Sequence, residues 1–185
     1  MSSALQTLLQ NPAIWRGSEP ARVALPSIAT GFATLDRELP GGGWPRGAIA
    51  EVLNERAGIG ELSLFIPALA KLSAAAGWLM LIAPRWIPYA PALAARGVQL
   101  SKLAVVNTQS DKDTMWAAEQ SLRAGNCSAV LVWPHTLDER GLRRLQLAAE
   151  EGGSFAALFG DASRAAPSSP APLRIRLGGS QNRLS

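Results

Sequence analysis

The sequence is poor in the residues that carry most metal and redox chemistry. Its 185 residues include one cysteine, Cys127, and one histidine, His135. A lone cysteine cannot form an internal disulfide, and these two residues alone cannot build a zinc cluster. Neither has a partner in the sequence that indicates a nucleophile. We therefore expect no metal, no cofactor and no covalent catalysis at either residue.

Long apolar runs are also missing. No stretch of 18 apolar residues occurs, and no charged segment followed by an apolar one stands at the N-terminus. The composition, 48% hydrophobic and 17% charged, still provides enough apolar side chains for a core. We expect a cytoplasmic protein of about one domain that does not bind membranes.

Lysine is scarce, with three lysines against fifteen arginines, and the net charge is +4. Residues 1–139 hold eleven basic and eleven acidic side chains, so the excess positive charge lies entirely in residues 140–185. A basic end of this kind is typical of contact with nucleic acid or an acidic partner. It is equally typical of a solvated surface in an arginine-rich chain, and the charge alone leaves both interpretations open.

Short apolar segments alternate with helical patterns along the chain. Strands are predicted at residues 48–53, 78–83, 103–107, 129–133, 154–159 and 173–177, and helices at 3–10, 61–76, 89–96, 113–124 and 138–150. This alternation predicts an α/β fold with a mainly parallel central sheet flanked by helices. Ligand sites in such folds lie beyond the carboxyl ends of strands, here in the turns after Leu53, Ala83 and Trp133.

The turn after the first of these strands has the setting of a phosphate-binding P-loop. It contains Gly58 and Gly60, but Glu61 and Leu62 stand where a working loop has its lysine and its magnesium-binding hydroxyl. A carboxylate about 4 Å from a phosphate costs about 4 kcal/mol at an effective dielectric constant of 20. We therefore expect no ordinary nucleotide binding, although glycine turns followed by glutamate also begin many helices for structural reasons alone.

Residues 28–36 and 39–52 resemble the segment that leads into the P-loop of the bacterial recombinase RecA. The resemblance continues to cover about residues 27–177. Carried over by position, the P-loop lysine falls at Glu61, the catalytic glutamate at Arg85 and the Walker B aspartate at Trp133. Their loss removes nucleotide clamping, water activation and magnesium support together. The resemblance thus implies a degenerate RecA-like domain that is not an enzyme.

A second resemblance is to the ImuA family of RecA-like translesion-synthesis accessory proteins. It rests on residues 14–17, 39–47, 89–92, 115–120, 133–134 and 143–146. It implies a non-catalytic adaptor of damage-induced (SOS) mutagenic DNA synthesis. The implied partners are the ImuB-type Y-family polymerase relative, RecA and an error-prone C-family polymerase.

The alternative is a cell-division inhibitor that resembles SulA, a RecA-like protein that binds the tubulin-like FtsZ. The resemblance to SulA is weaker, because SulA lacks the glycine-rich entry seen here at residues 31–47. The two hypotheses differ in their partner, a polymerase complex in one and FtsZ in the other.

The RecA resemblance divides the chain into residues 1–26, an N-terminal helix and linker; residues 27–177, the RecA-like domain; and residues 178–185, a disordered tail. Because the N-terminal helix of RecA packs on a neighbouring subunit, the segment 3–16 is a candidate docking arm. Its candidate contact residues are Leu5, Leu8, Leu9 and Trp15. The alternative is a helix folded back on its own core.

Two aromatic residues, Trp86 and Tyr89, follow a strand at the former nucleotide edge. They are candidate interface anchors, and the alternative is that they fill the vacated pocket. Trp133 is expected to fill the vacated magnesium site.

Four arginines form a candidate basic patch for DNA or an acidic partner: Arg143 and Arg144 on a helix, and Arg174 and Arg176 on one face of a strand. Direct DNA binding is expected to be weak or absent, because few charges cluster and no aromatic stacking platform accompanies them.

Overall fold

The computed structural model describes residues 26–178 except residues 57, 59, 166 and 167. The predicted helix at 3–10, the docking arm with Leu5, Leu8, Leu9 and Trp15, and the tail beyond residue 178 lie outside the described residues.

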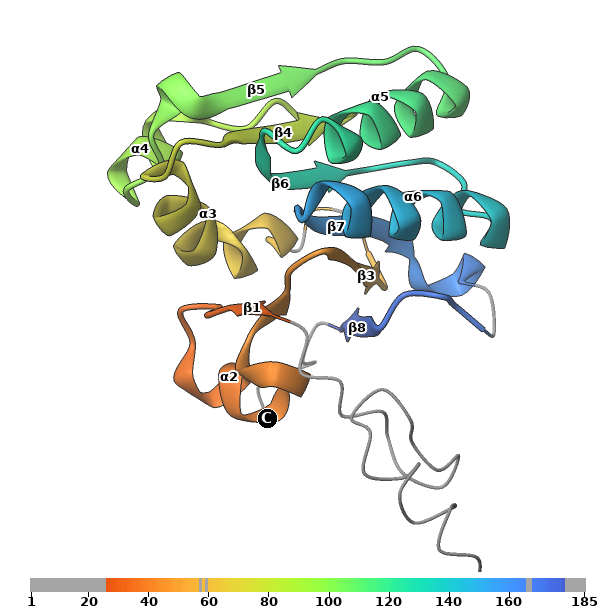
Figure 1. Ribbon diagram of the computed structural model, residues 1–185, viewed down its shortest axis with the longest axis horizontal. Coiled ribbons are helices and arrows are strands. Elements are labelled where there is room, and N and C mark those ends of the chain that lie inside the picture. The colour runs from red at the N-terminus through yellow and green to blue at the C-terminus, as the bar shows by residue number, and fades with distance from the viewer. Residues whose placement is uncertain (1–25, 57, 59, 166–167, 179–185) are drawn as a thin grey trace, which may run out of the picture.

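A six-stranded sheet forms the centre of the molecule (Figure 1). Its strands are β3 (Ala48–Asn54), β4 (Trp78–Ile82), β5 (Leu103–Val106), β6 (Cys127–Val132), β7 (Phe155–Asp161) and β8 (Leu173–Leu177). They lie in the order β5-β4-β6-β7-β3-β8, and each neighbouring pair is parallel. All seven residues of β3 are buried, as a strand covered on both faces requires. The predicted α/β fold class is confirmed.

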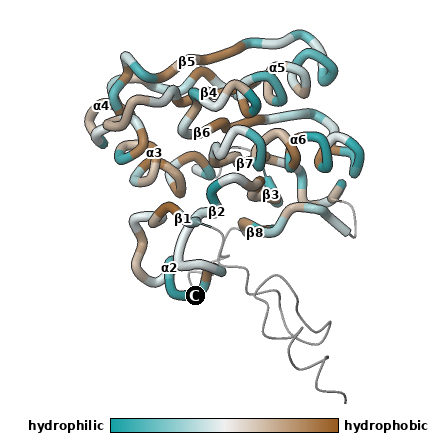
Figure 2. Tube along the Cα trace, in the orientation of Figure 1, coloured by the Kyte–Doolittle hydropathy of each residue, from teal (hydrophilic) through white to brown (hydrophobic). Residues whose placement is uncertain are grey.

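Helices cover the two faces of this sheet. Helix α3 (Ile66–Ser73) packs on β4 and β6, while α5 (Asp111–Arg123) and α6 (Glu139–Gly152) lie side by side on the opposite face (Figure 1). Helix α4 (Ala90–Ala95) follows β4. Apolar residues concentrate in the strands, and hydrophilic residues lie along the outer surfaces of α5 and α6 (Figure 2). The core is therefore divided into two layers, one on each side of the sheet.

A small N-terminal unit precedes the sheet. It consists of α2 (Ala33–Glu38) and an antiparallel pair of short strands, β1 (Ser27–Ile28) and β2 (Trp44–Pro45). Short 3₁₀ turns are η1 (Pro40–Gly42), η2 (Glu61–Leu64), η3 (Leu100–Lys102) and η4 (Ala162–Arg164). Trp44 of β2 is fully buried and stacks on Phe65 with ring centroids 4.5 Å apart, which joins this unit to the core.

The helix predicted at 61–76 differs from the observed structure. The segment begins with the 3₁₀ turn η2, and the α-helix runs only from Ile66 to Ser73. Pro67 lies in the first turn of α3, and proline has no N–H to donate to a preceding carbonyl. A continuous α-helix from Glu61 would place Pro67 in its second turn, so the helix starts again at Ile66.

Asp111 connects α5 to the loop after β6. Its carboxylate accepts hydrogen bonds from the backbone N–H groups of His135 (2.8 Å) and Thr136 (3.0 Å) and from the Thr136 hydroxyl (2.7 Å). Partial burial opposes ionisation of Asp111, but these hydrogen bonds and the nearby His135 outweigh it and lower its pKa below the ordinary value. The ionised form therefore stabilises the folded state.

We expect Asp111→Ala to lower the free energy of unfolding by about 1–3 kcal/mol at pH 7, because three donors lose their acceptor. The folded-state pKa is depressed, so this contribution is complete above the ordinary pKa of aspartate. It is lost as the pH falls through the folded-state value. Urea unfolding of both proteins between pH 7 and pH 3 measures the effect.

The matched control is Asp113→Ala, which removes the same charge from the same helical turn but no contact with the β6 loop. The difference in the free energy of unfolding between wild type and Asp111→Ala should shrink toward low pH. Equal stability of the two variants at pH 7 would contradict the role of Asp111.

Candidate functional site

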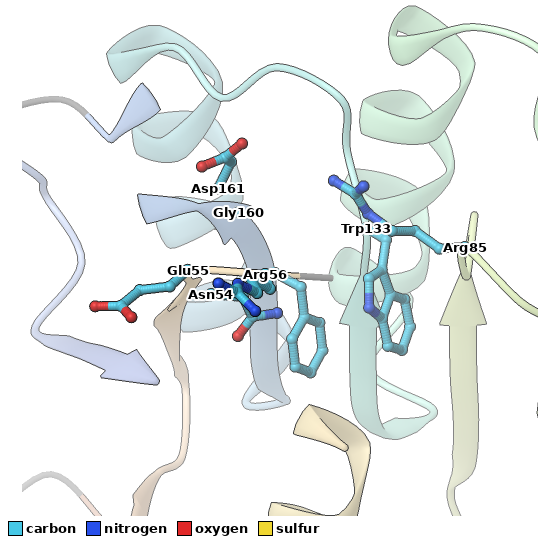
Figure 3. Close-up of a pocket in the computed structure, with 8 residues that line it drawn as sticks. Asn54, Glu55, Arg56, Arg85, Trp133, Gly160 and Asp161 are labelled. Atoms are coloured by element: carbon cyan, nitrogen blue, oxygen red, sulfur yellow. The ribbon is translucent and has the colours of Figure 1, made fainter. Parts of the chain in front are cut away.

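Two adjoining cavities lie at the carboxyl ends of the central strands. The strand-end cavity, of about 70 Å³, is lined by residues including Asn54, Arg56, Arg85, Trp133 and Asp161 (Figure 3). The loop cleft, of about 210 Å³, is lined by residues including Glu61, Leu62, Trp86, Ile87 and Pro88. Arg85 and Trp133 line both. The cavities thus occur at the turns where the sequence predicts a ligand site, and Glu61, Arg85 and Trp133 meet there.

The degenerate P-loop turn places a carboxyl group where RecA has its lysine. Gly58 and Gly60 have φ values of 78° and 88°, in the left-handed region that favours glycine. Glu61 then begins η2 and is only 7% exposed. Leu62 packs against the core, so no hydroxyl stands at the magnesium position. This turn has neither of the side chains that hold a nucleotide phosphate and its metal.

Trp133, at the position that the RecA resemblance assigns to the Walker B aspartate, is 6% exposed. Its ring stacks on Phe159, with centroids 4.4 Å apart and planes 7° from parallel. Its backbone N–H donates to the Ile82 carbonyl at 3.0 Å, which fixes the end of β6 beside β4. Burial and ring stacking make Trp133 part of the core, and its filling of a former magnesium site stays a prediction.

Arg85 and Asp161 lie on opposite sides of the strand-end cavity, with the guanidinium of Arg85 turned toward the side of Asp161 (Figure 3). Hydrogen bonds from the Ser163 hydroxyl (2.6 Å) and backbone N–H (2.8 Å) lower the pKa of Asp161, and Arg164 and Arg85 add to the effect. A carboxyl group held ionised in this way is a poor general acid at neutral pH. Arg85 and Asp161 thus place opposite charges in the same cavity without forming an ion pair.

The four candidate arginines do not form an uncompensated basic patch. Arg143 pairs with Glu139 at 2.7 Å, Arg144 pairs with Glu119, and Arg174 Nε lies 2.7 Å from a Glu51 oxygen. Arg176 is exposed on β8. Three of the four arginines are thus paired with carboxylates of the fold, so they offer less free positive charge to DNA or an acidic partner than their count suggests.

The loop between β4 and α4 carries exposed apolar side chains, and we call residues 86–89 the aromatic loop. Trp86 is 59% and Tyr89 72% exposed, so most of each side chain is open to contact, while the Trp86 ring also forms part of the wall of the loop cleft. Ile87, 86% exposed, was missed by the sequence interpretation. The sequence signal that could have indicated its exposure is its position between Trp86 and Pro88 in a loop. The Trp86 ring lies against Gly58, where an added Cβ would come within 3.2 Å of it.

Fold and site together define a RecA-like domain whose ATPase positions hold residues that cannot perform ATPase chemistry. A family model described as "Cell division inhibitor SulA" matches residues 47–156. The chain belongs to this family.

Individual relatives agree with this assignment. SulA of Pectobacterium carotovorum subsp. carotovorum is 33% identical over 112 residues, 57% of this chain and 67% of the relative. SulA of Pectobacterium atrosepticum is 30% identical over 133 residues, 71% and 70% of the two chains. The crystal structure of SulA from Pseudomonas aeruginosa aligns with a TM-score of 0.51 at 24% identity, over 60% of this chain and 96% of that one, and shows the same fold.

The family assignment corrects the ImuA prediction. Membership of ImuA, the role in translesion synthesis, and the polymerase and RecA partners are wrong; the SulA alternative is the one supported. The residues that indicated ImuA include the RecA-like framework common to the superfamily. The glycine-rich entry that favoured ImuA over SulA mostly precedes residue 47, where the family match begins. The sequence motifs therefore identified the superfamily and not the branch.

The prediction that the chain is not an enzyme is confirmed by its membership of a family of division inhibitors. Within the described residues, no helix is both long and apolar enough to cross a bilayer. No cluster of three or more histidine, cysteine, aspartate or glutamate residues in that part of the chain could hold a metal ion.

We expect Trp133→Ala to lower the free energy of unfolding by about 3–5 kcal/mol, because it removes a buried ring and leaves a cavity against Phe159. Trp116→Ala is the control, since Trp116 is 62% exposed on α5 and its loss should change stability by no more than about 0.5 kcal/mol. Chemical denaturation measures both. Similar values for the two variants would show that Trp133 does not hold this edge together.

Proposed function

We propose that the protein inhibits cell division by binding FtsZ without catalysing a reaction. The observation that carries the proposal is membership of the SulA family together with Glu61, Arg85 and Trp133 at the three ATPase positions. A domain of this kind acts through its surface. We further propose that it acts in the cytoplasm, as part of the SOS response to DNA damage.

The aromatic loop is the surface that best fits a protein partner. Trp86, Ile87 and Tyr89 are large apolar side chains, each more than half exposed, within four consecutive residues. Aromatic side chains dominate binding energy at protein interfaces, and neighbouring exposed apolar residues mark such sites. Pro84 and Pro88 restrict the backbone around the loop, which lowers the entropy lost when a partner binds. We therefore propose that FtsZ contacts residues 86–89.

Expression of the protein in a bacterium whose FtsZ is the binding target should give long, undivided cells without DNA damage. The expected cause is loss of FtsZ polymers, which sedimentation of purified FtsZ with and without the protein would measure. Normal division at a level where the protein is folded and abundant would contradict the proposal.

The double variant Trp86→Ala/Ile87→Ala should weaken FtsZ binding by about 30-fold or more, as loss of an interface hot spot worth about 2 kcal/mol does. Trp116→Ala removes an equally exposed tryptophan from α5 and should bind as the wild type does. Biolayer interferometry with immobilised FtsZ compares the three. Equal affinity of the double variant and wild type would move the interface away from the aromatic loop.

A further inference from the structure

Glu61 is a buried acidic side chain that has no partner among the described residues. It is 7% exposed and makes no hydrogen bond or ion pair with any residue that the structure describes. Its Oε2 atom is fully buried without a partner. Every other acidic residue in the buried class has an arginine: Glu51 pairs with Arg174, and Glu119 with Arg123 and Arg144. Burying an acidic group without a partner is costly. Glu51 and Glu119 avoid this cost through their arginines, and Glu61 does not.

The loop cleft is the open space beside Glu61. Apart from Glu61 and Arg85, its lining is glycine, apolar or aromatic, with Trp86, Pro88 and Trp133 among the walls. A carboxyl group in an apolar cleft beside an indole ring is a suitable receptor for a planar cation. Guanidinium groups stack on aromatic faces and form charge-assisted hydrogen bonds to carboxylates.

The described arginines near the cleft do not pair with Glu61. Arg85 lines both cavities, but its guanidinium is turned toward the side of Asp161, whose pKa it helps to lower (Figure 3). Arg56 lines the strand-end cavity and does not line the cleft. Arg96, from the end of α4, donates to the Ser63 hydroxyl at 3.5 Å. None of these side chains pairs with Glu61, so the part of the fold that the structure describes supplies no cation to this carboxyl group.

We propose that the loop cleft receives an arginine side chain of the partner protein, with its guanidinium against the Glu61 carboxylate and the ring of Trp86. The identity of the partner rests on the proposed function, which places the aromatic loop against FtsZ. The cleft opens beside that loop, because Trp86, Ile87 and Pro88 belong to both. The proposal thus adds a charged contact to the apolar one.

The chemistry of the cleft is tested without FtsZ. Nα-acetyl-arginine amide is titrated into the ¹⁵N-labelled full chain, and the indole N–H signal of Trp86, assigned with Trp86→Phe, is followed by NMR. We expect saturable binding in the millimolar range, and at least tenfold weaker binding of Nα-acetyl-citrulline amide, which has the same shape without the charge. Glu61→Gln should weaken arginine binding at least tenfold.

The matched control is Glu55→Gln, which removes a carboxylate from the same turn; Glu55 lines the strand-end cavity and not the cleft. It should bind the arginine probe within twofold of wild type. Equal binding of the arginine and citrulline probes, no binding of either, or an unchanged affinity in Glu61→Gln would overturn the proposal.

The second arm uses FtsZ and separates the two proposals. Glu61→Gln should weaken FtsZ binding at least tenfold, and Glu55→Gln should not change it. If wild type binds FtsZ and Glu61→Gln binds equally well, the arginine contact is overturned and the proposed function stands. If wild type does not bind FtsZ, the proposed function is wrong, and the arginine and citrulline titrations still decide the chemistry of the cleft.

Discussion

The stack of Trp133 on Phe159 determines what the carboxyl edge of this sheet can do. The two rings lie nearly parallel at 4.4 Å, and Phe159 in turn meets Phe65 edge to face at 5.5 Å, which continues to Trp44. Aromatic side chains bury large areas, so this series of rings supplies much of the core on the α3 side. It ends where a RecA-like ATPase would hold magnesium. The indole thus packs into the core at the position that the RecA resemblance assigns to the Walker B aspartate.

Several arginines of this arginine-rich chain form ion pairs with buried glutamates. Glu119 lies between α5 and α6 and pairs with Arg144 and, at 2.8 Å, with Arg123, while Arg123 also reaches Glu151. Glu51 on β3 pairs with Arg174 on the edge strand β8. Arginine suits such positions because its guanidinium donates in several directions at once. Two of the seven arginines in residues 140–185, Arg144 and Arg174, thus join different elements of the fold, so the charge count alone overstates the positive charge that is available to a nucleic acid.

The alternation of apolar segments was sufficient to predict the sheet, because buried parallel strands must be nearly continuous apolar runs. The convergence of Glu61, Arg85 and Trp133 also followed from sequence, since the carboxyl ends of parallel strands share one edge. The ion pairs of Arg144 with Glu119 and of Arg174 with Glu51 could not be predicted from the sequence, because each depends on which carboxylate a neighbouring element presents. The exposure of Ile87 depends on how the loop leaves β4, through Ala83 at a φ of 53° and then Pro84. The family branch was missed because both candidates share the RecA-like framework.

Loss of the nucleotide site does not by itself explain why the buried residue 61 is a glutamate. The helix N-terminus favours a glutamate in the first turn, but at the buried first position of η2 an apolar residue would avoid burying a carboxyl group without a counterion. Leu62 and Trp133, at the positions of the magnesium-binding hydroxyl and the Walker B aspartate, are apolar residues that pack in or against the core, whereas Glu61 is acidic. Within the described fold it lacks a counterion, and it borders a cleft whose other wall is the exposed aromatic loop. A carboxyl group that weakens the free protein is reasonable where a bound partner supplies the missing charge, so the cost in the free state becomes selectivity in the complex.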